Sequence, residues 1–208
     1  RRAYSNSRLV YVKVLSMPEN PNPQGKGLRP VMAFLEESRA PALMAQPKQI
    51  KQISLELFTS LFVLESDFKF KPVRGSTYWL YQKNGRFWLS PIRPDEWSPD
   101  VYGRYIGECE LHDDMTWSLE MCEEAAADAE LMASLEQRWE SFEEAMEESD
   151  TVEDALPRYQ GQMPFYQRAY AFALAHSLRA SMQGSGIQAL SYREAQAQLP
   201  DDSGAEGQ

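Results

Sequence analysis

The sequence predicts an α+β fold: a small three-stranded antiparallel meander over residues 76–111, packed against several α-helices in a single domain. Asn84-Gly85 separates two short segments of aromatic and β-branched residues, which is typical of a hairpin with a type I′ turn. Residues 103–111 then alternate between two faces, as a third strand does. A sheet this small cannot stand alone in water, so it must bury one face against helices from the flanking chain.

Three amphipathic segments are predicted to be helices. The first spans about 47–68, and the last, about 164–182, is apolar around most of its circumference and is expected to lie at the centre of the core. Between them, Ser118 can cap a helix with one apolar and one acidic face. Residues 120–150 contain twelve acidic residues against Arg138 alone, in a chain of net charge −10. Because no histidine lies in that segment, we interpret its carboxylates as a solvated face and not as a metal site.

The ends of the chain are expected to lie outside the core domain, which is predicted to span 47–183. Residues 1–16 are basic and read as an upstream extension or flexible arm, with an extra edge strand as the alternative. Residues 17–46 are predicted to form an N-terminal arm that includes a short helix. Residues 184–208 are rich in Gly, Ser, Gln and Asp, so we expect a disordered tail.

Composition favours a cytoplasmic protein that has no membrane partner. Hydrophobic residues make up 43% of the chain, yet no segment approaches the roughly 18 uninterrupted apolar residues of a membrane span. The two cysteines, Cys109 and Cys122, are too few for a disulfide framework and lack the paired spacing of a zinc or redox site. A bridge between them is the alternative, and it would be unusual in the cytosol.

Four short motifs give the chain a family resemblance. They are Gly75 to Tyr81, Leu89 to Trp97, Tyr105 to Leu111 and Asp114 to Trp117. In this order and spacing they resemble the signature block of the domain of unknown function 2452 family, and the likeness to its bacterial members extends over about 17–182. The resemblance implies a shared fold and brings no reaction, cofactor or catalytic residue.

Candidate binding residues lie in and beside the aromatic segment: Trp79, Tyr81, Trp88, Glu96, Trp97, Asp114 and Trp117. A sheet this small carries more rings than a one-sided core needs, and surplus surface aromatics are the residue types that dominate protein interfaces. The alternative is that the helices bury all of these rings. A carboxylate beside an indole, such as Glu96, can be partly desolvated and so acquire a pKa useful for catalysis, although turn carboxylates also accept backbone hydrogen bonds.

The sequence favours a non-catalytic module that binds another protein through the aromatic sheet face or the acidic helix. An acidic helix would steer a basic partner. The chain has two scattered histidines, no metal-ligand spacing, no phosphate loop and no nucleophile context, so no cofactor or metal is predicted. The first alternative is a small hydrolase or transferase with a site near Glu96 and His112. The second is a module that binds single-stranded nucleic acid, which the acidic helix disfavours.

Overall fold

The computed structural model describes residues 45–96, 98–157 and 164–198. The elements follow one another as α2 (Ile50–Leu64), β1 (Ser76–Lys83), β2 (Arg86–Ser90), η2 (Pro94–Glu96), α3 (Pro99–Tyr102), β3 (Arg104–Leu111), β4 (Trp117–Met121), α4 (Glu123–Ala126), α5 (Ala129–Glu148), α6 (Phe165–Ser185) and α7 (Tyr192–Ala197). Helices combine with an antiparallel sheet, so the predicted α+β class is confirmed. Residues 1–44, which include the predicted extension over 1–16 and nearly all of the predicted arm over 17–46, lie outside the described residues.

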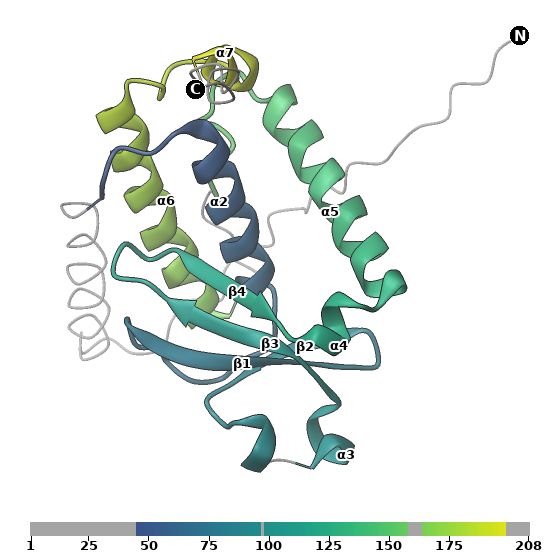
Figure 1. Ribbon diagram of the computed structural model, residues 1–208. Coiled ribbons are helices and arrows are strands. Elements are labelled where there is room, and N and C mark those ends of the chain that lie inside the picture. The colour runs from purple at the N-terminus through teal and green to yellow at the C-terminus, as the bar shows by residue number, and fades with distance from the viewer. Residues whose placement is uncertain (1–44, 97, 158–163, 199–208) are drawn as a thin grey trace, which may run out of the picture.

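The sheet has four strands in the order β2-β1-β3-β4, and not the three strands of the predicted meander. The β1–β2 hairpin forms as predicted, with Asn84 at φ 52° and Gly85 at φ 73°. In a simple meander β3 would pair with β2, but here it pairs antiparallel with β1. The connection over residues 91–103 contains η2 and α3, and it is long enough to carry the chain to the other edge of β1 (Figure 1).

The fourth strand replaces the start of the predicted acidic helix. Ser118 was expected to cap that helix, but it lies inside β4. Apolar and polar residues alternate along Trp117–Met121, which is the period of a strand. The long helix begins only at α5, where the Asp128 side chain accepts a hydrogen bond from the backbone N–H of Leu131 at 2.9 Å.

The chain remains folded beyond residue 184, where a disordered tail was expected. Helix α7 begins with a capping box, in which Ser191 and Glu194 each satisfy a backbone N–H of the other. Three apolar side chains of this segment are buried against the core: Ile187, Tyr192 and Ala195. These three buried side chains stabilise the segment, although its overall composition is polar. Residues 199–208 lie outside the described part of the chain.

The core lies between the sheet and the helices α2 and α6, which cover one face of the sheet, while η2 and α3 lie on the other side (Figure 1). Side chains that are almost fully buried come from every layer: Ile53 and Leu57 of α2, Leu80, Ile106 and Leu111 of the sheet, and Leu174, Leu178 and Met182 of α6. The predicted covering helices therefore lie where they were expected. None of the described helices is both long and apolar enough to cross a membrane.

Residues in and after α2 form hydrogen bonds with both edge strands of the sheet. Beside β2, the backbone N–H of Asp67 donates to the carbonyl of Phe87 at 2.9 Å, and Leu89 donates to the carbonyl of Asp67 at 3.1 Å. Beside β4, the backbone N–H of Trp117 donates to Oγ of Ser60 at 2.8 Å. Helix α2 and its C-terminal continuation therefore fix the position of the sheet.

Candidate functional site

The side of the sheet opposite α2 and α6 carries several of the predicted binding residues, and we call it the outer face. Cross-strand partners share a face, and the register pairs Tyr81 with both Trp88 and Tyr105, and Trp79 with Glu108. Trp79 and Trp88 are partly exposed there, whereas the neighbouring Tyr78 and Leu80 point into the core.

Trp79 is flanked by one positive and one negative side chain. Its indole Nε1 donates a hydrogen bond to Oε1 of Glu108 at 3.3 Å. The guanidinium of Arg93 lies 5.5 Å from the ring centroid, within the range of a cation–π contact. Both contacts hold the indole in one orientation while it remains partly accessible.

Tyr81 lies beneath the connection between β2 and β3 and is only 2% exposed. Its hydroxyl donates to the carbonyl oxygen of Ile92 at 2.8 Å. Burial, followed by the nearby carboxylates of Asp95 and Glu96, raises the pKa of Tyr81 to about 12. The connection therefore buries Tyr81, whereas Trp79 and Trp88 on the same face stay partly exposed.

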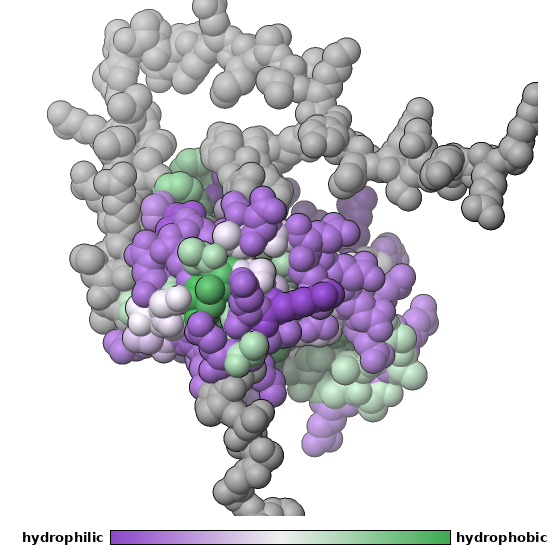
Figure 2. Space-filling view, turned by 90° about the horizontal axis from the view of Figure 1, so that it is seen from above, coloured by the Kyte–Doolittle hydropathy of each residue, from purple (hydrophilic) through white to green (hydrophobic). Residues whose placement is uncertain are grey.

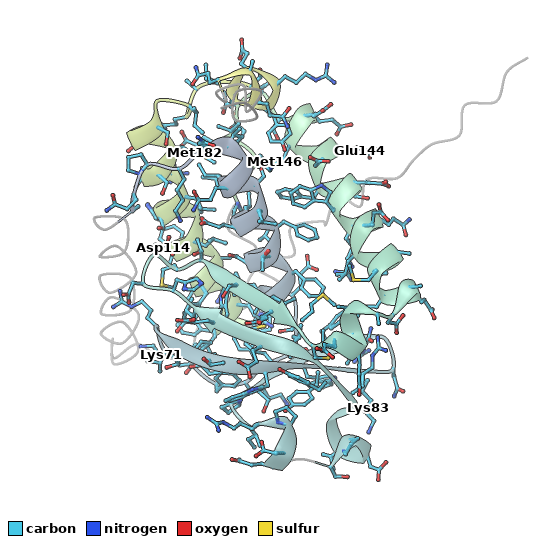
Figure 3. The ribbon with its side chains drawn as sticks, viewed as in Figure 1. Lys71, Lys83, Asp114, Glu144, Met146 and Met182 are labelled. Atoms are coloured by element: carbon cyan, nitrogen blue, oxygen red, sulfur yellow. The ribbon has the colours of Figure 1, made fainter. Side chains whose placement is uncertain are left out.

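Trp88 lines a pocket of about 470 Å³ at the hairpin end of the outer face, together with Lys83, Asn84, Arg86 and Val101. The ammonium of Lys83 donates to two carbonyl oxygens of α3, at 2.6 and 3.2 Å. Two cations and one indole therefore surround the pocket. Figure 3 shows Lys83 at this end of the sheet, close to α3.

The opposite half of the outer face is acidic. Glu108, Glu110 and Glu120 are all exposed, and the register places Glu108 directly opposite Glu120. Nδ1 of His112 lies 3.9 Å from Oε1 of Glu110. The outer face thus combines a basic, aromatic end with an acidic end.

Glu96 and His112 do not meet in one pocket. Glu96 is exposed in η2, near Tyr81, which pairs with Tyr105 at the start of β3. His112 follows the end of that strand, seven residues further on, and seven residues of extended strand span roughly 23 Å. Figure 3 shows the length of the sheet, with Lys83 and Asp114 at its opposite ends. The alternative enzyme site therefore lacks the convergence that general acid–base chemistry requires.

Asp114 stabilises the β3–β4 turn and connects it to the start of α2. Its Oδ1 accepts hydrogen bonds from Thr116, from the backbone N–H at 3.1 Å and from Oγ1 at 2.6 Å. Its Oδ2 accepts from Nζ of Lys48 at 2.6 Å, and Lys48 also donates to Glu56 at 2.6 Å. Burial opposes ionisation of Asp114, but the hydrogen bonds from Lys48 and Thr116 outweigh it and hold the pKa of the carboxyl below its usual range.

The remaining predicted binding residues are distributed differently. Trp117 is 2% exposed on the core side of the sheet, and its Nε1 has no hydrogen-bond partner among the described residues. Trp97 lies outside the described residues.

Both thiols are free, with Cys109 buried and Cys122 partly buried. Within residues 45–96, 98–157 and 164–198, no group of three His, Cys, Asp or Glu side chains is placed to bind a metal ion.

A smaller hollow of about 270 Å³ lies at the α7 end of the helices, lined in part by Pro47, Ile50, Ile187 and Ala195. Figure 2 looks onto this end and shows a small apolar patch surrounded by hydrophilic residues. The charged residue in its wall, Lys48, already binds two carboxylates. The hollow therefore offers less to a ligand than the outer face does.

Sequence reasoning missed Arg93 and Glu108 as neighbours of Trp79. The contact between Glu108 and Trp79 requires β1 to pair with β3, and the predicted meander excluded that pairing. Arg93 approaches Trp79 because the β2–β3 connection folds back across the outer face. Opposite charges on both sides of a tryptophan are visible in the sequence only once the strand order is known.

Searches of curated proteins and of solved structures found no significant match to this chain. A match was found among protein families, and it covers the whole of α2, the whole sheet and the first half of α5. Over residues 43–138, the chain resembles the family described as "Protein of unknown function (DUF2452)".

Proposed function

We propose that this protein is a protein-interaction module and that the outer face of the sheet contacts another polypeptide. One observation carries the proposal: Trp79 and Trp88 remain partly exposed, although the other face of the sheet already has a core with Tyr78 and Trp117 buried in it. Large rings that the fold does not need to bury are typical of the centre of protein interfaces. The contacts of Trp79 with Arg93 and Glu108 pre-order this ring and so reduce the entropic cost of binding.

The charges of the outer face favour a protein partner over nucleic acid. Phosphates would be attracted at Lys83 and Arg86 but repelled at Glu108, Glu110 and Glu120 on the same face. A protein surface can match both signs. Binding of single-stranded nucleic acid remains the second candidate because the Trp88 pocket places an indole beside two cations, as stacking platforms do.

Variants of the outer face test this proposal. The full chain captures partners from a native lysate, and the captured proteins are quantified by mass spectrometry. Trp79→Ala combined with Trp88→Ala should reduce the recovery of specific partners by roughly tenfold or more, as expected for interface anchors. Leu55→Ala, which removes an exposed apolar side chain from α2, is the matched control and should leave recovery unchanged.

The two candidate functions give different outcomes. Purified chain is titrated into a fluorescein-labelled single-stranded oligonucleotide, and the change in anisotropy is measured. Saturable binding that Trp88→Ala and Arg86→Ala abolish would replace the protein partner with nucleic acid. Undiminished recovery of every partner by the double tryptophan variant would refute the role of the outer face altogether.

A further inference from the structure

Helix α5 is anchored at its two ends, whereas its middle contacts α2 through side chains that remain partly exposed. Its inward stripe consists of Leu131, Leu135, Trp139, Phe142 and Met146, and only the first and the last of these are buried. The three residues between them are partly exposed. Figure 1 shows α5 standing away from α2 over most of its length. A helix that packed fully against the core would bury the middle of its apolar stripe first.

Polar contacts hold both ends of α5. At its start, Asp128 caps the helix and forms an ion pair with Arg104 at 2.5 Å. At its end, Arg193 of α7 pairs with Glu147 at 2.6 Å, and the hydroxyl of Tyr192 donates to Glu143 at 3.3 Å. These contacts fix both ends of the helix.

A groove of about 360 Å³ lies between α2 and α5. Phe58, Leu61 and Phe62 of α2 form its floor, and Phe142 with the small residues Ser134 and Ser141 forms its α5 side. Edge-to-face contacts of Phe58 with Trp139 at 5.0 Å and with Phe142 at 5.6 Å keep these rings in place. The volume falls in the range of about 300–1,000 Å³ that is typical of ligand pockets, so the groove can accept a few large apolar side chains.

The border of the groove is acidic. Spacings of three and four residues place Glu130, Glu144 and Glu148 on the same stripe of α5 as Ser134 and Ser141, and all three glutamates are exposed. Across the groove, Glu65 belongs to its lining. The one cation of α5, Arg138, is paired with Glu65 at 3.1 Å and lies 5.7 Å from the ring centroid of Phe62. The glutamates of that stripe therefore have no cation on α5 to neutralise them.

We propose that the groove between α2 and α5 binds a basic amphipathic helix of another protein. Apolar side chains at i, i+3, i+4 and i+7 of that helix insert over Phe58, Leu61 and Phe62, and its Lys and Arg side chains face Glu144 and Glu148. The apolar floor supplies the affinity and the acidic border selects the charge of the partner. This surface is separate from the outer face of the sheet, so the inference does not rest on the function proposed above.

A synthetic peptide pair tests the proposal directly. A fluorescein-labelled helix with leucine on one face and lysine elsewhere is titrated with the full chain, and anisotropy is measured. The same composition in scrambled order, which destroys the apolar face, is the control peptide. We expect the amphipathic peptide to bind at least tenfold more tightly than the scrambled one, and to weaken as salt rises from about 50 mM to about 300 mM.

Three variants locate the binding. Ser141→Phe fills the groove and should weaken binding of the amphipathic peptide roughly tenfold. Glu144→Lys with Glu148→Lys should weaken it similarly, whereas Glu123→Lys with Glu124→Lys makes the same change of charge on α4, which does not line the groove, and should leave binding nearly intact. Circular dichroism melting curves show whether each variant is folded.

Several outcomes would overturn the proposal. Equal affinity for the amphipathic and scrambled peptides would mean that the groove recognises no apolar face. If the two double glutamate variants lost the same affinity for the amphipathic peptide, the charge effect would be only the general attraction of a basic peptide to an acidic protein. Unchanged binding by a folded Ser141→Phe variant would place the peptide elsewhere.

Discussion

Replacing Lys48 with methionine should destabilise the protein by removing the cation that connects the start of α2 to the β3–β4 turn. The Lys48 side chain is 9% exposed and donates to Glu56 and Asp114, each at 2.6 Å. Hydrogen bonds to charged groups contribute about 1.5–3 kcal/mol each. Because both carboxylates remain about one-fifth exposed, solvent screening reduces the combined loss to roughly 2–3 kcal/mol. For a chain of this size that loss corresponds to a fall in Tm of roughly 4–12 °C.

The pH dependence of this loss follows from the two pKa shifts. Burial opposes the charge on Lys48, but its hydrogen bonds to Asp114 and Glu56 outweigh that effect and raise its pKa above 10.5. Its stabilising contribution is therefore complete below 10.5 and disappears as the pH rises through the folded pKa. The pKa of Asp114 is lowered, so its contribution is complete above the ordinary carboxyl value and disappears as the pH falls through the folded pKa. The difference between wild type and variant should be largest from about pH 5 to about pH 9 and shrink on both sides.

Urea unfolding followed by tryptophan fluorescence across this pH range measures the effect. Lys51→Met is the matched control, because Lys51 is exposed in the same helix and no ion pair involves it within the described residues. A Lys48→Met variant within about 0.5 kcal/mol of wild type at neutral pH would refute the contribution assigned to the cluster. A difference that stayed constant down to about pH 2 would refute the assignment to charge.

Three further substitutions test the described packing. Ser60→Ala leaves the backbone N–H of Trp117 unpaired in the core and should cost about 1–3 kcal/mol in urea unfolding; a loss below about 0.5 kcal/mol would mean that water replaces the hydroxyl. Gly103→Ala places a methyl group at a residue whose φ is +83°, and this methyl would clash with the carbonyl oxygen of the facing β1 residue. The Tm of Gly103→Ala should therefore fall further than that of Gly85→Ala, because Gly85 has a φ of +73° but open space around it. Tyr81→Phe should remove one phenol from the part of the ultraviolet titration near pH 12, together with that residue's share of the stability that is lost between about pH 10 and pH 12; if the missing phenol instead titrates near pH 10, the burial of that hydroxyl is contradicted.

The sequence was sufficient to predict those elements that depend on residues close to one another along the chain. Asn84-Gly85 predicts its own turn because both residues accept positive φ. The stripes of α2 and α6 are long enough to be read from spacing alone. β4 was missed because Ser118 can cap a helix, and Met121 also fits the helical spacing that continues through Cys122 and Ala125.

Strand order and the orientation of the rings depend on tertiary packing. Both edges of the β1–β2 hairpin offer backbone groups to β3, and the choice between them depends on contacts distant in sequence: Asp67 pairs with β2, and residues 91–103 carry the chain to β1. Tyr78 and Trp79 are consecutive aromatic residues, and a shift of one residue in register would exchange which of them is buried. The site at Trp79 was therefore predictable as an aromatic segment, but its charged neighbours were not.

The hydrogen bonds at both edges of the sheet should limit self-association of the protein. An open edge strand is a template on which a second chain can add a strand and begin an aggregate. Here Asp67 forms backbone hydrogen bonds with β2, and Ser60 takes up an outward amide of β4 while α2 packs along that strand. If either contact were lost, the backbone N–H and C=O groups of an edge strand would become accessible to a second chain. We therefore expect Ser60 and Asp67 to protect the protein from polymerising during folding.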